Sequence, residues 1–379
     1  MTAPRTLLQI TDKGPGQGGI ARVVAQHAAL ATAHGWNVRR LRLVSGAARP
    51  APGLSDMLAP VELARHLPAT SELLQRLEAA LAGVDVVHLH LGFDSLAPDV
   101  VRHAAARAPL IVHLHDTAPF KPPRPRTLRE GLARRVLRPI RRAAWAAVRS
   151  EASCVVAPSR FLLDAAVETG LPRARTALVH HGIAIPDTAP APPSARPPVV
   201  LYAGLLSRAK GAPLLLDAFA KLDVPAARLR FLGDGPDAGA MRARASAPDL
   251  AGRVQFLNRV APSDVARHMS EAKVTAFPTL LDEGLGLSGV EALAQGCPVA
   301  GFARGGAAEW LIDGQTGLVA QAATPEALAD AMTQLLSDGA LADRLAATGR
   351  ALVAREFSEA RMIAALDGLF VRLTKGQAA

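Results

Sequence analysis

The sequence is poor in cysteine and aromatic residues, and each scarcity excludes a class of protein. Only Cys154 and Cys297 occur, too few for a disulfide framework, so we expect a reducing compartment, the cytoplasm. A single tyrosine leaves no interleaving of aromatic and basic side chains, which argues against a nucleic-acid-binding module. No apolar run reaches about 18 residues, so neither a membrane-spanning helix nor a signal peptide is expected.

The excess of positive charge lies entirely in the first half of the chain. The formal net charge of the 379 residues is +10. Residues 1–195 hold 24 Lys+Arg against 14 Asp+Glu, whereas residues 196–379 hold 19 of each. A coding bias towards arginine would act on both halves, so the asymmetry indicates an acidic partner for the first half: a membrane surface, a diphosphate carrier or nucleic acid.

Strand-like apolar runs alternate with helical patterns along both halves, which predicts parallel βαβ units and an α/β fold. A proline-rich linker is expected at residues 186–198. The expected strands cover residues 5–10, 37–43, 84–89, 109–114, 153–157 and 176–180 before the linker, and 198–203, 227–232, 253–257, 273–277 and 298–302 after it. With 379 residues, two domains of roughly 180 residues each are expected.

A glycine-rich loop follows the first expected strand. Gly14, Gly16 and Gly19 satisfy the G-x-G-x-x-G pattern of dinucleotide-binding proteins. The second strand, residues 37–43, ends without the acidic residue that this pattern requires for NAD. An NAD(P)-dependent oxidoreductase therefore stands as the alternative function rather than the first. His27, on the apolar face of the helix that follows, is expected to be a core residue.

Histidines occur in pairs on two neighbouring strands. His88 and His90 are followed in the next strand by His113 and His115, and i, i+2 spacing places each pair on one side of its strand. Packing within the sheet is favoured over metal binding for His88 and His113. His115, next to Asp116 at the strand end, is the better functional candidate. No D-x-D motif occurs, so the carboxylate clamp for a metal–diphosphate complex is missing.

Residues 121–149 combine a helical apolar repeat with clustered arginines. Five arginines fall within nine residues: Arg134, Arg135, Arg138, Arg141 and Arg142. Such a basic amphipathic helix, kinked near Pro139, suits an anionic membrane surface. An ordinary helix, with its apolar face on the core and its arginines in solvent, explains the same residues about as well. Trp145 slightly favours the membrane.

The second half carries its polar signals at strand ends. Gly204 opens a loop that ends with Arg208, Lys210 and a helix start, where two cations would hold a diphosphate. Further on, a glycine-punctuated turn leads into a helix expected over residues 285–295. The first amides of that helix make an anion site. Glu283 precedes the helix and Glu291 lies within it, at the edge of its apolar face, where half-buried carboxylates would accept hydrogen bonds from sugar hydroxyls.

In this order, the motifs resemble family 4 of the retaining glycosyltransferases over nearly the whole chain. The matching parts are Gly18-Gly19, His115-Asp116, Ala157-Pro-Ser159, His181-Gly182-Ile183, Gly204 to Gly211, Gly233-Asp-Gly235-Pro, Glu283 through Glu291, Gly305-Gly306 with Glu309, and Thr316-Gly317. The resemblance implies the GT-B architecture, two Rossmann-like domains with the active site in the cleft between them. We expect an acceptor domain at residues 1–185, a donor domain at 199–357, and a final helix, 358–379, that packs back on the first domain.

The resemblance also implies roles for individual residues. Lys210 would neutralise the donor diphosphate, with amides of Gly286 and Leu287 as further donors. Glu291 would hold the ribose, and His115 and Glu283 would lie beside the transferred sugar as the catalytic candidates. The remaining donor-binding positions are Gly18, Gly19, Gly204, Arg208, Gly233 and Val260. Where the family often has arginine, this chain has Leu205. Either Arg208 replaces that arginine from the next turn, or phosphate binding is weaker.

The resulting expectation is a retaining, metal-independent hexosyltransferase with no cofactor beyond its nucleotide-sugar co-substrate, a UDP- or GDP-sugar. The acceptor is expected to be a lipid-linked saccharide, such as one carried on polyprenyl diphosphate, in bacterial surface polysaccharide synthesis. The enzyme would work in the cytoplasm, peripherally on the inner face of the membrane.

Overall fold

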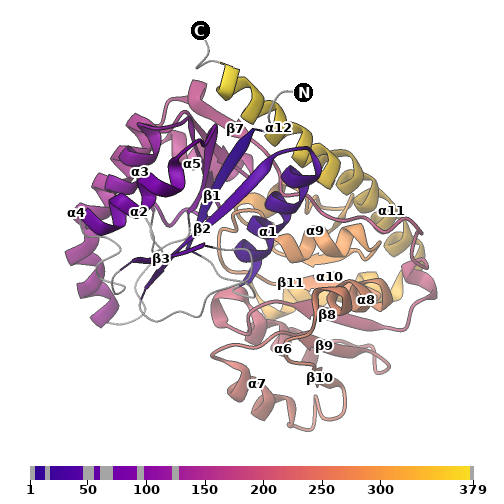
Figure 1. The fold of residues 1–379 in the computed structure, drawn as a ribbon. Helices are drawn as coiled ribbons and strands as arrows, with labels where there is room; N and C mark the ends of the chain where they lie inside the picture. Colours follow the sequence, from indigo (N-terminus) through magenta and orange to yellow (C-terminus); the bar gives the residue numbers. More distant parts are fainter. Residues whose placement is uncertain are drawn as a thin grey trace. The chain divides into compact units, whose positions relative to one another are not determined.

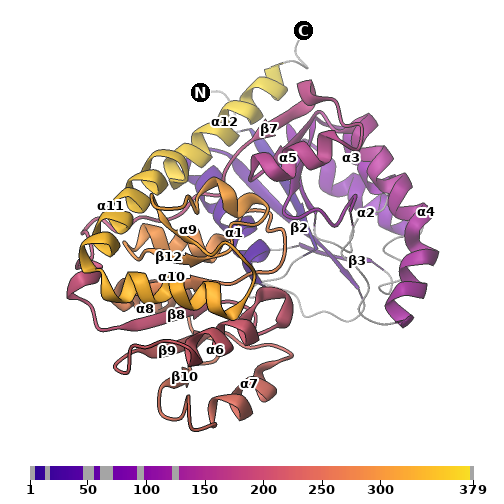
Figure 2. The same ribbon diagram turned by 180° about the vertical axis from the view of Figure 1, so that it is seen from behind.

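The computed structural model describes residues 5–12, 18–45, 55–59, 71–91, 98–121 and 128–375. The chain divides into two compact units. Unit 1 comprises Met1–His180 together with Met362–Ala379, and unit 2 comprises His181–Arg361. Figures 1 and 2 show the elements of each unit from two sides.

Unit 1 is built on a parallel sheet of seven strands in the order β3-β2-β1-β4-β5-β6-β7. Its strands are β1 (Thr6–Thr11), β2 (Asn37–Ser45), β3 (Ser55–Ala59), β4 (Val86–Leu91), β5 (Leu110–Leu114), β6 (Cys154–Ala157) and β7 (Thr176–Leu178). Its helices are α1 (Gly18–Ala33), α2 (Ser71–Leu81), α3 (Pro98–Ala105), α4 (Leu128–Glu151), α5 (Arg160–Val167) and most of α12 (Glu359–Lys375). This strand order is that of a Rossmann-type doubly wound sheet with one further strand.

Helices pack on both faces of this sheet, and successive residues of a strand point to opposite sides, so β1 contributes to a core on each face. Leu8 and Ile10 of β1 join a core cluster with α3 and α4, whereas Leu7 joins a second cluster on the other side. Helix α12, yellow in Figure 1, gives five apolar side chains to that second cluster, and Trp36 donates from Nε1 to Asp367 Oδ1 at 2.7 Å. The last helix of the chain is therefore part of the core of unit 1.

Unit 2 repeats the design with six parallel strands in the order β10-β9-β8-β11-β12-β13. Its strands are β8 (Val199–Ala203), β9 (Arg228–Leu232), β10 (Val254–Phe256), β11 (Val274–Phe277), β12 (Val299–Gly301) and β13 (Gly317–Val319). Its helices are α6 (Ala212–Ala220), α7 (Ala238–Ala245), α8 (Pro262–Glu271), α9 (Leu287–Ala294), α10 (Pro325–Ser337) and α11 (Gly339–Glu356). The strand order reverses between β8 and β11, which is where open α/β sheets bind ligands.

The predicted fold class, an α/β chain with two Rossmann-like sheets, is confirmed. Two strands were missed. β3 is a sheet-edge strand between Pro52 and Pro60 and contains no β-branched residue. β13 lies at the edge of the unit 2 sheet, pairs with β12 through only three residues and starts with Gly317. In the described ranges, no helix has the length and apolar character needed to cross a bilayer.

Candidate active site

The loop that follows β8 is held against the loop that follows β11. Gly211 has φ of +69°, and a Cβ there would lie 1.8 Å from the carbonyl oxygen of Pro278, so only glycine fits. Leu280 N–H donates to the Ala209 carbonyl at 3.0 Å. The buried Ser207 hydroxyl accepts from the Lys210 backbone N–H at 3.3 Å, which caps the short 3₁₀ turn Arg208–Lys210. Main-chain contacts therefore fix where the Lys210 side chain starts.

Lys210 and Glu283 meet across these two loops. Lys210 Nζ donates to both carboxylate oxygens of Glu283, at 2.7 and 2.9 Å. Thr279 Oγ1 donates to Glu283 Oε1 at 2.7 Å. The Glu283 side chain is only 12% exposed and that of Lys210 34% exposed. Charge-assisted bonds in such a shielded place are stronger than those of a surface pair. The family resemblance implies separate roles for these two residues, and the fold brings them into contact.

Helix α9 begins beside this pair. Gly286 is its N-cap, with φ of +86°, and Leu287 is its first residue. The first amides of a helix have no acceptor inside it, so they are available to an anion. Trp310 lies beneath this helix start: it is fully buried, its Nε1 donates to the Leu285 carbonyl at 2.6 Å, and its ring meets Phe277 edge-on at 5.0 Å. The packed rings of Trp310 and Phe277 thus hold the first turn of α9 in place.

The remaining predicted positions of unit 2 lie on the same sheet edge. Glu291 is half-buried on α9. Gly233, after β9, approaches Gly204 so closely that a Cβ would lie 2.0 Å from the Gly204 carbonyl oxygen. Val260, after β10, is partly buried against the unit 2 core. Arg208 is exposed, and its backbone N–H donates to Asp237 Oδ2 at 2.6 Å.

Three residues of this region were not predicted from the sequence: Thr279, Tyr202 and Trp310. Tyr202 donates from its hydroxyl to the Leu205 carbonyl at 2.8 Å, which fixes the loop after β8. Burial raises the pKa of Tyr202, and the charge of Glu283 adds to that shift. The available signal was that the only tyrosine of the chain stands two residues before Gly204.

The candidate residues of unit 1 lie at the start of α1 and after β5. Gly18 opens α1 with φ of +85°, and both Gly18 and Gly19 are exposed. The preceding loop with Gly14 and Gly16, on which the dinucleotide pattern depends, lies outside the described residues. His115 is half-buried just beyond β5, with its Nε2 at 3.2 Å from His90 Nδ1.

The arginine-rich segment forms α4, and its exposed face is basic. Arg135, Arg138 and Arg142 are exposed and Arg141 is half-buried. The side chain of Arg134 lies outside the described residues.

The prediction that Trp145 favours membrane contact is wrong. Trp145 is buried in the unit 1 core, where it packs against Phe120 and donates from Nε1 to Thr169 Oγ1 at 2.6 Å. The helical repeat places Trp145 on the core-facing side of α4, so it anchors that helix to the sheet.

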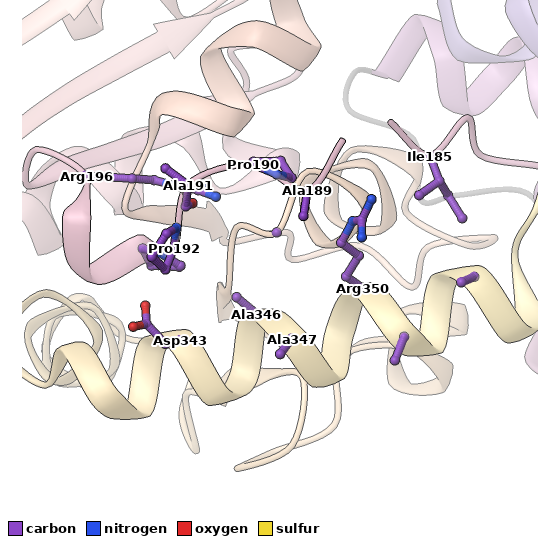
Figure 3. A pocket seen from close by; sticks show the side chains of 14 residues that line it. Ile185, Ala189, Pro190, Ala191, Pro192, Arg196, Asp343, Ala346, Ala347 and Arg350 are labelled. Carbon is purple, nitrogen blue, oxygen red and sulfur yellow. Dashed lines mark hydrogen bonds between the residues drawn. The ribbon is translucent and has the colours of Figure 1, made fainter. Parts of the chain in front are cut away.

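A separate hollow of about 390 Å³ lies between residues 185–196 and helix α11 (Figure 3). Alanines and prolines form most of its wall. The guanidinium of Arg196 already donates to the carbonyls of Ala191, Met269, Ala272 and Gln295. This arginine therefore fastens the proline-rich segment to unit 2. The one acid that lines the hollow, Asp343, already accepts hydrogen bonds from the Ser194 backbone N–H and hydroxyl.

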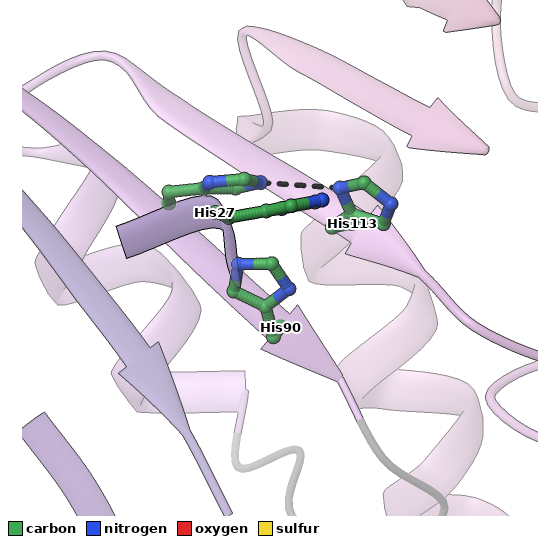
Figure 4. A group of neighbouring side chains, drawn as sticks. His27, His90 and His113 are labelled. Atoms are coloured by element: carbon green, nitrogen blue, oxygen red, sulfur yellow. Dashed lines mark hydrogen bonds between the residues drawn. The ribbon is translucent and has the colours of Figure 1, made fainter. Parts of the chain in front are cut away.

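Unit 1 also holds a group of buried imidazoles that is suited to a metal (Figure 4). His27 of α1, His88 and His90 of β4, and His113 of β5 each offer a nitrogen within 4.8 Å of the other three. Burial lowers the pKa of His27 to about 3 and the pKa values of His88 and His113 well below the usual range, with neighbouring imidazoles adding to the shift for these two. All three are therefore neutral near pH 7.

Comparison with known proteins identifies the family. The model of "Glycosyltransferase Family 4" matches residues 17–185, and that of "Glycosyl transferases group 1" matches residues 187–352. The two matches together cover both units. The chain belongs to family 4 of the glycosyltransferases. These family matches favour a glycosyltransferase over the NAD(P)-dependent oxidoreductase considered as the alternative.

Two curated relatives are similar over part of their length. A GDP-mannose-dependent alpha-(1-6)-phosphatidylinositol monomannoside mannosyltransferase of Mycolicibacterium smegmatis is 34% identical over 163 residues, which is 41% of this chain and 42% of the relative. The lipopolysaccharide core biosynthesis glycosyltransferase LpsE of Rhizobium meliloti is 31% identical over 161 residues, or 42% of this chain and 46% of the relative. The matches thus span less than half of these relatives.

A solved structure shows the same family fold over nearly the whole chain. The crystal structure of HepE from Anabaena in complex with UDP-glucose has a TM-score of 0.73 at 20% identity and covers 97% of this chain and 100% of that one. At this identity the likeness concerns the fold alone. Lys210, Glu283 and the start of α9 come together because β8 and β11 are neighbouring strands of the unit 2 sheet.

Proposed function

We propose that this protein is a retaining glycosyltransferase that moves a hexose from a UDP- or GDP-sugar to a lipid-linked saccharide in bacterial surface polysaccharide synthesis. The observation that carries the proposal is the bidentate contact of Lys210 with Glu283 beside the start of α9. A cation, a shielded carboxylate and free helix amides are what a sugar diphosphate requires.

Donor binding would proceed by an exchange of partners. The diphosphate competes with Glu283 for Lys210 because phosphate oxygens carry more negative charge than one carboxylate. Release of Lys210 leaves the Glu283 oxygens free to accept hydrogen bonds from hydroxyls of the transferred sugar, while Thr279 keeps the carboxylate in place. The N-terminal amides of α9 complete the diphosphate site, so no metal ion is needed there.

The roles of the other residues follow from the family resemblance. Glu291 would hold the ribose hydroxyls, and His115 of unit 1 would lie beside the anomeric carbon. The departing phosphate would help to deprotonate the acceptor, so positioning and charge stabilisation provide most of the catalysis. Gly18 and Gly19 allow the backbone at the start of α1 to approach the phosphates.

The choice of donor and acceptor is supported by the relatives. One curated relative uses GDP-mannose and carries phosphatidylinositol in the name of its acceptor, and another acts in lipopolysaccharide core biosynthesis. The structural neighbour binds UDP-glucose. These names favour a UDP- or GDP-hexose and a saccharide attached to lipid.

A binding and activity panel tests the donor site. UDP-glucose, UDP-galactose, GDP-mannose and a dTDP-sugar are compared by thermal shift, since a ligand at 100 times its dissociation constant stabilises by about 2.7 kcal/mol. Lys210→Ala should weaken binding of the best donor about 10–100-fold, since it removes a charged hydrogen bond worth about 1.5–3 kcal/mol. Glu283→Gln should reduce turnover. NMR of the product anomer tests retention, and assays in chelator test metal independence.

A second lysine–glutamate pair of unit 2 provides the matched control. Lys221 Nζ and Glu326 Oε1 lie 2.9 Å apart at the surface, away from the strand ends that carry Lys210 and Glu283. Lys221 caps the end of α6, and Glu326 is in the first turn of α10. Lys221→Ala and Glu326→Gln should leave donor affinity and turnover unchanged. The proposal is wrong if the Lys210 variant binds the donor as well as the Lys221 variant does, or if no nucleotide sugar shifts the melting temperature.

Membrane association through α4 is tested separately. At about 1 kcal/mol per arginine near an anionic surface, changing Arg135, Arg138 and Arg142 to glutamine should weaken binding to phosphatidylglycerol vesicles about 100-fold at low salt. The control changes three exposed arginines of unit 2, Arg344, Arg355 and Arg361, to glutamine. Equal losses for both triple variants, or no vesicle binding by the unchanged protein, would favour a soluble acceptor.

A further inference from the structure

Four histidines of unit 1 come together from three separate elements. α1 contributes His27, β4 contributes His88 and His90, and β5 contributes His113, and all four are buried. Their rings lie 4.1–5.8 Å apart, centroid to centroid, in every pairing. Figure 4 shows the rings of His27, His90 and His113 gathered above the strand ends. Strand alternation explains why His88 and His90 share a face, but it does not require a helix to add another imidazole there.

We propose that His27, His88, His90 and His113 bind one divalent transition-metal ion, such as Zn²⁺ or Co²⁺, which fixes α1 to the sheet of unit 1. The site is distinct from the Lys210 region of unit 2, and it stands whether or not the proposed function is correct.

The distances fit a tetrahedral ion after a small contraction. Zinc–imidazole bonds of about 2.0–2.1 Å place the four nitrogens of a tetrahedral site about 3.3 Å apart. His88 Nε2 and His113 Nδ1 already lie 3.2 Å apart. The remaining nitrogens lie within 4.8 Å of each other, so rotations of the rings that move each nitrogen by about an ångström complete the site.

The chemistry of the cluster also suits a metal. Metal ligation needs neutral imidazole, and burial keeps His27 and His113 in that form. All-imidazole sites select zinc, copper, nickel or cobalt rather than magnesium or calcium.

The position of the cluster gives the metal a structural role. His27 lies in the third turn of α1, and Gly18 and Gly19 are the first residues of the same helix. An ion bound to His27 would therefore fix the position of these two glycines relative to the sheet. His90 Nδ1 also lies 3.2 Å from His115 Nε2. A metal on His90 Nε2 would displace the Gln9 side-chain amide, which lies 3.2 Å from that nitrogen, and would fix the tautomer of the neighbouring His115 through Nδ1.

The experiment measures bound metal in protein without a polyhistidine tag. The protein is produced in medium supplemented with Zn²⁺ or Co²⁺, so that the ion is present while the chain folds, and is then gel-filtered and analysed by elemental mass spectrometry. About one equivalent per chain is expected. The Co²⁺ form should show the intense visible absorption of tetrahedral nitrogen coordination rather than the weak bands of an octahedral, water-rich ion.

Two histidine variants, one within α1 and one just after it, give the matched comparison. His27→Gln should reduce bound metal at least about tenfold, because losing a ligand costs no less than losing an outer partner of one. His34→Gln alters an exposed histidine just after the end of α1 and should retain the full equivalent. Circular dichroism establishes that both variants fold. Should His27→Gln not fold, His113→Gln replaces it and the cobalt spectrum of the unchanged protein decides.

Three outcomes would overturn the proposal. The unchanged protein could carry less than a tenth of an equivalent after folding with metal, His34→Gln could lose as much metal as His27→Gln, or cobalt could give only an octahedral spectrum.

Discussion

Replacing Gly289 of α9 with alanine should destabilise unit 2, because the new methyl group would meet the indole of Trp310. A Cβ at Gly289 would lie 1.9 Å from Trp310 Cη2 and 2.5 Å from Cζ2. Ordinary van der Waals contact begins near 3.4 Å, so the ring or the helix has to move by about 1.5 Å. Trp310 is fully buried, packs edge-on against Phe277 and donates to the Leu285 carbonyl, so it has little freedom to move.

The size of the effect follows from three contributions. Overpacking a well-packed core costs about 1–3 kcal/mol. Breaking the bond from Trp310 to Leu285 would leave a buried donor unpaired, at about 1–3 kcal/mol. The higher helix propensity of alanine relative to glycine stabilises the variant by at most about 1 kcal/mol. We expect a net loss of about 2–3 kcal/mol in the free energy of unfolding of unit 2.

The measurement is urea denaturation followed by tryptophan fluorescence. Trp310 is the only one of the three tryptophans in unit 2, so its signal isolates that unit when Trp36 and Trp145 are replaced with phenylalanine in the parent protein. Gly239→Ala in α7 is the matched control: a Cβ there meets nothing within 4 Å, so this variant should gain up to about 1 kcal/mol. If Gly289→Ala were as stable as its parent while the control gained, the packing argument would be refuted.

Three further results are expected. In a double-mutant cycle of Lys210→Met and Glu283→Gln, the stability effects should be non-additive by about 0.5–3 kcal/mol, and strict additivity in thermal unfolding would contradict their contact. Because His27 takes up its proton more readily unfolded than folded, stability should fall as the pH drops below 6.5 towards 3, by up to about 1.4 kcal/mol per unit; His27→Gln should flatten this slope in urea titrations. Burial raises the pKa values of Cys154 and Cys297 to about 11, so neither should react with a thiol reagent at pH 8 before denaturation.

Regular alternation of strands and helices was predictable from the sequence, because the buried strands of parallel sheets are continuous apolar runs. β3 and β13 were not, since a short strand at a sheet edge pairs on one side only and needs little apolar character. β3 forms because β2 offers it a free edge, with Leu41 beside Ser55 and Leu43 beside Met57. That pairing depends on the fold and not on the local residues.

The candidate site was predictable as a set of residues but not as a set of contacts. The glycines and the helix start after β11 mark a strand-end turn in any βαβ unit. The pairing of Lys210 with Glu283 joins positions 73 residues apart and arises only once β8 and β11 are neighbours. Thr279 escaped notice for the same reason, since a lone threonine carries no pattern. His27 was predicted to be a core residue, and its burial agrees, but its proximity to three other imidazoles depends on how α1 lies on the sheet.

Two glycines in the turns around the loop after β8 contact another backbone segment directly. Gly211 lies against the carbonyl of Pro278, and Gly233 lies against the carbonyl of Gly204. Random mutagenesis can change little there, because almost any new side chain would push two strand-end turns apart. The neighbouring Leu205 and Leu281, 46% and 37% exposed, have no such restriction. In a mutant library screened for a new sugar preference, we therefore expect the tolerated substitutions at Leu205 and Leu281. Gly211 and Gly233 should stay unchanged whatever the preference.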